Sequence, residues 1–98
     1  MERDLALARL RSLEPELRHR GVVGCALFGS TARDEAGADS DVDVLIDLPT
    51  PHGLSALDLA RLYALIEDRM GVRTEVVLRR NLKPFLRDSI LADAVLVF

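Results

Sequence analysis

Apolar and polar residues alternate along the chain with two different periods, which divide it into predicted helices and strands. Residues 2–20 follow a helical spacing, and Pro15 divides them into two segments, because proline is tolerated at a helix start but not inside a helix. Residues 54–70 repeat the helical spacing, with Ser55 or the preceding turn as their start and Gly71 as their stop. A shorter helix is expected over residues 84–91, introduced by Asn81.

Four apolar stretches predict β-strands. Residues 22–28 form an almost wholly apolar run, which is typical of a strand buried on both faces. Residues 41–48 alternate aspartates with aliphatic residues, so the two kinds of side chain point to opposite faces. Residues 72–78 and 94–98 complete the set. The pattern predicts an α/β (α+β) fold, with a small mixed sheet of about four strands flanked by helices.

Length and composition narrow the class of protein. A chain of 98 residues supports one hydrophobic core, so a single domain over residues 1–98 is expected. No apolar run approaches the roughly 20 residues that span a bilayer, and the first residues lack the apolar segment of a secretory signal, so the expected location is the cytoplasm. Cys25 is the only cysteine, which excludes an internal disulfide. The net charge of −3 argues against direct nucleic-acid binding through a basic face.

The candidate chemistry begins with two aspartates. Asp41 and Asp43 are two residues apart on a predicted strand, so their carboxylates project from the same face. Two unpaired anions at this distance repel each other, and a divalent cation is the simplest relief at neutral pH. Oxygen ligands favour Mg²⁺ or Mn²⁺ over zinc. The alternative is a solvated strand face without a metal.

A second candidate lies just before the first. Gly29 and Ser30 follow the first strand where a helix should begin, which exposes backbone N–H groups to an anion such as phosphate. Arg33 follows about one turn later and could offset charge on the same ligand or anchor an acidic neighbour. Taken alone, the first two residues form an ordinary turn and Arg33 a surface ion pair. Together with the aspartates they favour a nucleoside triphosphate with its Mg²⁺.

These residues carry a resemblance to a known family. Gly29-Ser30, ten further residues and Asp41-Val42-Asp43 match the GSX10DXD pattern of the DNA polymerase beta-like nucleotidyltransferase superfamily. The stretch LFGSTARDEAGADSDVDVLI resembles its minimal nucleotidyltransferase (MNT) branch, and the resemblance extends over nearly the whole chain. It implies the nucleotidyltransferase fold, ATP as substrate, two Mg²⁺ ions and catalytic aspartates that activate the attacking hydroxyl. The implied positions are Asp41 and Asp43 for catalysis and metal binding, and Gly29, Ser30, Arg33 and Ser40 for the nucleotide.

The third metal ligand implied by the resemblance is Glu75, where the family more often has aspartate. The extra methylene lengthens the side chain by roughly 1.3 Å, so Glu75 must bend or its strand must shift to keep Mg²⁺ octahedral. A surface carboxylate is the alternative. Asp34 replaces a glycine that is frequent in the family, a change whose effect is expected to be limited to the turn. Asp47 shares the aspartate face but lies towards the far end of its strand, where a salt-bridge or solvent role is expected.

The resemblance also implies a biological role. MNT proteins are antitoxins of type VII toxin–antitoxin systems. They transfer AMP from ATP to a tyrosine of a cognate HEPN RNase toxin. The alternative is an inactive binding module that neutralises the toxin by steric contact. A transferase acting on small hydroxylated antibiotics is a third hypothesis. Apolar helix surfaces, or the terminal strand over residues 94–98, are candidates for contact with the toxin or with a second copy of the chain. Packing of the same residues in the core is the alternative.

Overall fold

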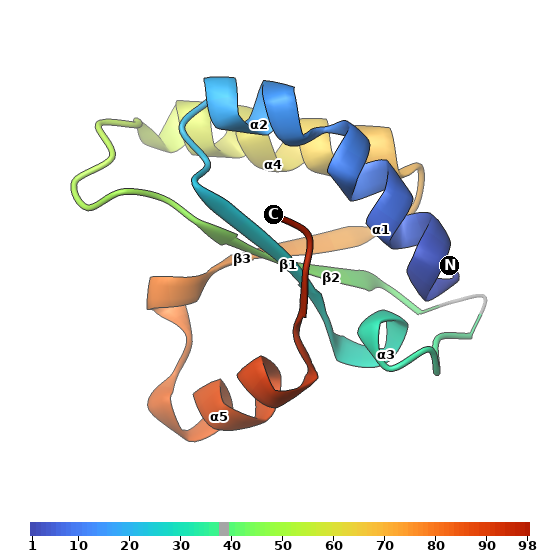
Figure 1. Cartoon of the computed structure of the whole chain (residues 1–98). Helices are drawn as coiled ribbons and strands as arrows, with labels where there is room; N and C mark the ends of the chain where they lie inside the picture. Colours follow the sequence, from blue (N-terminus) through green and yellow to red (C-terminus); the bar gives the residue numbers. More distant parts are fainter. Residues whose placement is uncertain (38–39) are drawn as a thin grey trace.

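The computed structural model describes residues 1–37 and 40–98 and consists of a sheet with helices on both faces (Figure 1). The strands are β1 (Gly24–Phe28), β2 (Val42–Asp47), β3 (Thr74–Leu78) and β4 (Val95–Leu96), in the order β3-β2-β1-β4. β2 is parallel to β3, whereas β1 is antiparallel to both β2 and β4. The expected mixed sheet of four strands with flanking helices is confirmed, although each strand is shorter than its apolar stretch.

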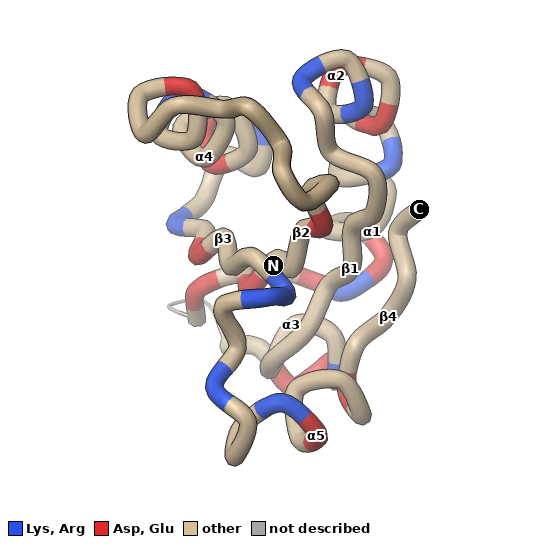
Figure 2. The backbone as a smooth tube through the Cα atoms, turned by 90° about the vertical axis from the view of Figure 1, so that its left-hand side faces the viewer, with Lys and Arg blue, Asp and Glu red and all other residues tan. Residues whose placement is uncertain are grey.

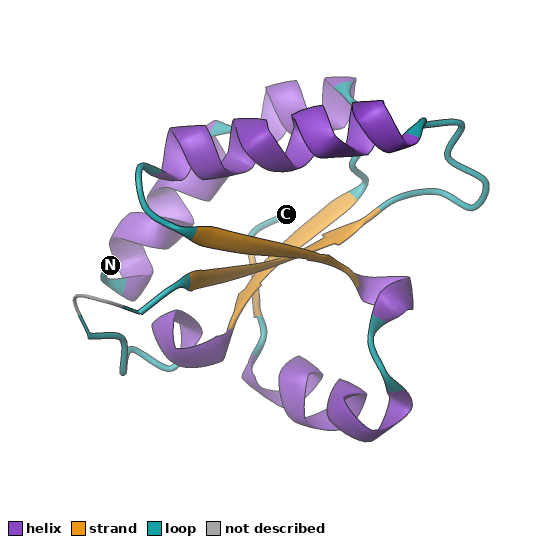
Figure 3. Ribbon diagram, turned by 180° about the vertical axis from the view of Figure 1, so that it is seen from behind, coloured by secondary structure: helices purple, strands orange, loops and turns teal. Residues whose placement is uncertain are grey.

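Three helices cover one face of the sheet: α1 (Arg3–Ser12), α2 (Glu14–His19) and α4 (Ala56–Met70) (Figure 3). The larger core lies between them and the sheet, where Val44 and Ile46 of β2 meet Leu10 and Ile66 with no exposed surface. Burying each such side chain contributes roughly 1.5–3 kcal/mol. The predicted break holds, because Pro15 lies in the first turn of α2, where its missing N–H costs nothing.

The opposite face is covered by α5 (Pro84–Asp93), which packs on a smaller cluster of Ala26, Phe28 and Leu45. β1 is therefore buried on both faces, as its apolar sequence predicts. Cys25 is buried in this strand, and burial, followed by the charge of Asp47, raises the pKa of its thiol to about 12. The thiol consequently stays protonated at neutral pH.

The boundaries of the later helices follow local capping chemistry. Ser55 caps α4 in a reciprocal pair of hydrogen bonds with Asp58, and Gly71 ends the helix with a φ of 74°, as the sequence predicts. Asn81 does not introduce the last helix. It lies in a 3-10 turn, η1 (Arg79–Asn81). The helix α5 begins at Pro84, as predicted, but Lys83 is the residue that precedes it, and it extends to Asp93 rather than to residue 91. Proline is favoured at this first position because its φ is already helical.

None of the helices in residues 1–37 and 40–98 combines the length and apolar character needed to cross a membrane.

The capping box of α4 supplies a test of the fold. Ser55→Ala removes the hydroxyl that accepts from the Asp58 N–H and should lower the free energy of unfolding by about 1 kcal/mol, measured by urea denaturation. Ser89→Ala, an exposed change inside α5, is the control and should not destabilise. Equal losses in both variants would show that the cap does not stabilise α4.

Candidate functional site

One end of the sheet gathers the residues singled out by the sequence. β1 ends at Phe28, which pairs with Asp43 at the start of β2, and Asp43 pairs in turn with Glu75 at the start of β3. Directly paired residues on neighbouring strands lie about 5 Å apart and point to the same face. The mixed topology therefore places the short helix α3 (Gly29–Ala32), Asp43 and Glu75 next to one another.

Gly29 is the tightest point of this arrangement. Its φ of +74° lies in the left-handed region, and a Cβ built on it would lie 3.1 Å from Cγ of Asp43 and overlap the carboxylate oxygen Oδ2. Any side chain at this position would therefore be strained and would push the Asp43 carboxylate away. The glycine allows the backbone that starts α3 to approach the carboxylate.

The electrostatics of Asp43 are unusual for an aspartate. Burial raises its pKa from 3.8 to about 6, and the charge of Glu75, a hydrogen bond with Glu75 and the charge of Asp41 act in the same direction. The positive charge of Arg33 lowers the pKa but does not cancel these effects. Like charges and partial burial disfavour the ionised form. A cation at this end of the sheet would reduce both the repulsion between the carboxylates and the cost of burying the ionised Asp43.

The donor set fits a hard divalent ion, since Asp41, Asp43 and Glu75 offer only carboxylate oxygens. Within the described residues, however, no three aspartate, glutamate, histidine or cysteine side chains lie close enough to hold a metal ion. Oδ1 of Asp41 lies 4.0 Å from Nε of Arg73, and the Glu75 side chain is exposed. The role of Asp41 and Glu75 as metal ligands stays a prediction.

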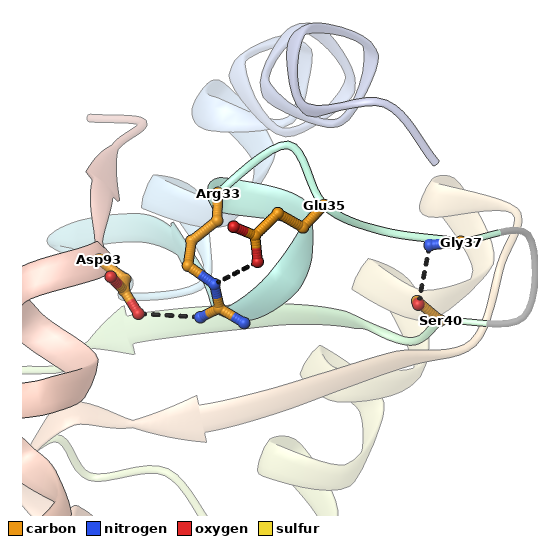
Figure 4. A network of polar contacts seen from close by, with 5 residues as sticks. All are labelled: Arg33, Glu35, Gly37, Ser40 and Asp93. Atoms are coloured by element: carbon orange, nitrogen blue, oxygen red, sulfur yellow. Dashed lines mark hydrogen bonds and ion pairs between the residues drawn. The ribbon is translucent and has the colours of Figure 1, made fainter.

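Arg33 is held by two carboxylates rather than pointing freely into solvent (Figure 4). Its Nη1 donates to Oδ2 of Asp93 at 2.8 Å, and its Nε donates to Oε2 of Glu35 at 3.1 Å. These two hydrogen bonds raise the pKa of the guanidinium. Arg33 is therefore an anchor between the end of α3 and the end of α5, the second of the two uses that the sequence left open. Nucleotide binding by Arg33 stays a prediction.

The loop after α3 is shaped by the other candidate residues. Ser40 accepts a hydrogen bond from the Gly37 N–H through Oγ at 3.1 Å, so it closes the loop that returns to β2 (Figure 4). Ser30 is half-buried, and its carbonyl accepts from the Glu35 N–H at 2.9 Å. Asp34 has a φ of 60°, a conformation that explains why glycine suits this position and that aspartate tolerates better than most residues. Nucleotide binding by Ser30 and Ser40 stays a prediction.

Two further features lie outside the reach of sequence reasoning. Asp93 is 60 positions from Arg33 and belongs to another helix, so no local spacing could have indicated it as a partner. Thr31 is fully buried, and its Oγ1 has no hydrogen-bond partner among the described residues. Asp47, by contrast, forms the expected salt bridge, with Oδ1 2.7 Å from Nε of Arg79.

Comparison with known proteins assigns the arrangement to a class. Residues 10–97 match the sequence family described as "Nucleotidyltransferase domain". Protein adenylyltransferase MntA of Thermococcus cleftensis is 36% identical over 89 residues, which cover 90% of this chain and 88% of MntA. These similarities extend across nearly all of the described elements.

Two solved structures resemble the fold. One, described as a minimal nucleotidyltransferase, aligns with a TM-score of 0.80 at 37% identity and covers 97% of this chain and 95% of its own. A chain from a toxin–antitoxin complex with AMP-PNP aligns with a TM-score of 0.72 over 92% of this chain and 72% of its own. At 15% identity, this match is evidence only that the two chains share a fold.

The close approach of Gly29 to Asp43 can be tested against a matched glycine. Gly53 has a similar φ of +68° but nothing within 4 Å of a built Cβ, so Gly53→Ala isolates the backbone strain, about 1–2 kcal/mol. Gly29→Ala adds the clash with the carboxylate and should cost more, measured by urea denaturation. Equal costs for the two variants would mean that the contact with Asp43 does not constrain the chain.

The raised pKa of Asp43 predicts a pH-dependent stability. The group binds its proton more tightly in the folded chain than in the unfolded one, so stability is lost as pH rises from about 4 to about 6. Partial exposure screens and reduces the effect. With divalent ions removed by EDTA, Asp43→Asn should raise the free energy of unfolding more at pH 7 than at pH 4. The pKa itself is measured by carboxyl carbon NMR.

The surface substitution Asp68→Asn serves as the control for exchanging a carboxylate for an amide. An Asp43 pKa near 4, or the same gain in stability at both pH values, would contradict the effect of burial and of the Glu75 and Asp41 charges on Asp43.

Proposed function

The chain belongs to the nucleotidyltransferase family, and from this premise we propose that it is a Mg²⁺-dependent protein adenylyltransferase. The observation that carries the proposal is the contact of the Asp43 carboxylate with Gly29, at a position where two further carboxylates raise the Asp43 pKa. Such a site has a glycine turn open to phosphate and a surplus of negative charge that a divalent ion would balance. Both are requirements of nucleotide transfer.

Gly29 and Ser30 would hold the phosphates of ATP in this mechanism. The phosphates would accept hydrogen bonds from the backbone N–H groups where α3 begins, and the Ser30 hydroxyl is a further donor. Arg33, fixed by Asp93 and Glu35, keeps a positive charge beside the same end of the sheet. Ser40, whose Oγ accepts from the Gly37 N–H, would contact the nucleotide just before β2 begins.

Asp41 and Asp43 would hold the Mg²⁺ ions, with Glu75, the register partner of Asp43 on β3, as the third ligand. Bound Mg²⁺ supplies charge neutralisation at the phosphates and lowers the pKa of the attacking hydroxyl. The contribution of the protein is to keep the acceptor oxygen and the α-phosphorus in line.

The transfer itself balances without a further reactant. The acceptor oxygen forms a bond to the α-phosphorus of ATP, the bond from that phosphorus to the bridging oxygen of pyrophosphate breaks, and the hydroxyl proton leaves to solvent or a carboxylate. The products are an adenylylated hydroxyl and pyrophosphate.

The proposed acceptor is a tyrosine of a HEPN RNase toxin, with this chain as the antitoxin of a type VII pair. Support comes from the relative named protein adenylyltransferase MntA and from the toxin–antitoxin complex of similar fold, whose description includes AMP-PNP. An adenylyl group adds a negative charge and bulk, which would oppose RNA at the toxin.

A second candidate is neutralisation by steric contact without transfer. Exposure of Glu75, and the absence of a preformed three-carboxylate cluster among the described residues, favour this alternative. The two candidates differ in whether the carboxylates are needed.

Transfer can be measured with ATP labelled at the α-phosphate, Mg²⁺ and a HEPN protein encoded beside this chain, with its RNase centre inactivated. The double variant Asp41→Asn plus Asp43→Asn should lose label transfer by about 10³-fold or more, because metal stabilisation of phosphoryl transfer amounts to several kcal/mol. The matched double variant Asp4→Asn plus Asp68→Asn changes two exposed carboxylates elsewhere and should transfer at the original rate.

Transfer that survives loss of Asp41 and Asp43 would end the catalytic assignment. A folded wild-type chain that protects RNA from the active toxin without labelling it, and does so equally well as the double variant, would establish the steric alternative.

A further inference from the structure

The far end of β2 carries a second feature that the proposed reaction site does not include. A cavity of about 140 Å³ lies between the end of β2, η1 and α5, and its lining includes Asp47, Thr50, Arg79, Arg80 and Arg87. Three arginines, two from η1 and one from α5, therefore line one space. The basic segments of η1 and α5 lie on the side of the molecule that faces the viewer in Figure 2.

The charges in this cavity do not balance. Arg79 is neutralised by Asp47, whose Oδ1 lies 2.7 Å from Nε of Arg79. Arg80 donates from Nη1 to the neutral hydroxyl of Thr50 at 2.9 Å, and Arg87 forms no ion pair with any residue in the described part of the chain. Two guanidinium groups thus remain uncompensated in one cavity of a chain whose net charge is −3.

The side chains that line this cavity favour an anionic ligand. Guanidinium groups present a planar fork of donors that matches carboxylate and phosphate oxygens, and they are more weakly hydrated than an ammonium group. The Thr50 hydroxyl also lines the cavity and can donate or accept a hydrogen bond. The cavity also exceeds by far the roughly 10–15 Å³ that a single water requires, so a polyatomic anion can enter.

The location of the cavity indicates which molecule would carry the anion. Asp43, Leu45 and Asp47 alternate along β2 and share one face, so the cavity lies on the face of the proposed metal ligands, about 13 Å further along the strand. The nucleotide phosphates are assigned to α3, at the opposite end of the sheet. In-line transfer requires the acceptor to approach from the side opposite the leaving pyrophosphate.

We propose that the cavity lined by Arg79, Arg80 and Arg87 is an oxyanion-binding site that receives a carboxylate or phosphate group of the acceptor. This inference rests on the proposed function for the identity of the ligand, whereas the anion site itself does not. Arg80 and Arg87 bind the anion, and Arg79, held by Asp47, forms the wall of the cavity. The bound group would orient the acceptor so that its hydroxyl reaches the carboxylates.

The site is tested first without any acceptor. Inorganic phosphate is titrated into the full chain while NMR records the Nε–H signals of its arginines. The signals of Arg80 and Arg87 should shift and saturate, and phosphate binding should be lost in Arg80→Gln plus Arg87→Gln. The control Arg11→Gln plus Arg20→Gln removes two exposed guanidinium groups elsewhere and should retain binding. The Asp41→Asn plus Asp43→Asn variant should also retain it.

Shifts that are uniform over all arginines, that do not saturate, or that survive in Arg80→Gln plus Arg87→Gln would overturn the site. The dispersion of the backbone amide spectrum confirms that each variant is folded. Because this arm needs no catalysis, it decides the anion site even if the chain transfers no label.

The second arm identifies the source of the anion by steady-state transfer to the HEPN protein. Arg80→Gln plus Arg87→Gln should raise the KM for the acceptor about tenfold, the loss expected for a charge-assisted contact, and leave the KM for ATP unchanged. Inorganic phosphate should compete with the acceptor in the wild-type chain. A raised KM for ATP with an unchanged KM for the acceptor would assign the cavity to the nucleotide and overturn the proposal.

Discussion

The close packing of the Asp43 carboxylate on the Gly29 backbone is the constraint around which the reaction end of this molecule is organised. It requires a glycine with a φ of +74° and a carboxylate whose pKa is raised to about 6. Neither feature stabilises the folded chain by itself. The left-handed φ of Gly29 restricts the backbone, and the Asp43 carboxylate places a negative charge in a partly buried position. The large apolar core on the opposite face of β2 offsets both, because Val42, Val44 and Ile46 are fully buried there.

The mixed topology explains how residues so far apart in sequence come together. Antiparallel pairing brings the end of β1 to the start of β2, and parallel pairing through the α4 crossover brings the start of β3 to the same place. The ion pairs of Arg33 with Asp93 and Glu35 then connect α3 to α5 across the same edge. The opposite end of β2 carries the arginine-lined cavity, so one face of the sheet presents an acidic end and a basic end. The two ends therefore suit ligands of opposite charge.

Sequence patterns predicted most of the elements but not the contacts between them. The alternation in residues 41–48 indicated both the strand and the face of its aspartates, and the Ser55 and Gly71 caps bounded α4. The start of the last helix at Pro84 was predicted correctly, but Asn81 does not introduce it, because Asn81 belongs to a separate 3-10 turn. The Arg33–Asp93 pair could not be predicted, since it depends on where α5 packs. Nor could the spacing reveal that Asp41 faces Arg73 while Glu75 pairs in register with Asp43.

A crystal structure of the chain with Mg²⁺ and a non-hydrolysable ATP analogue tests the proposed site directly. Oxygens of Asp41 and Asp43 should bind Mg²⁺ at about 2.0–2.1 Å, with the phosphates against the N–H groups of Gly29 and Ser30. A nucleotide bound elsewhere, with Asp43 still hydrogen-bonded to Glu75 and no metal between the carboxylates, would contradict the proposed site.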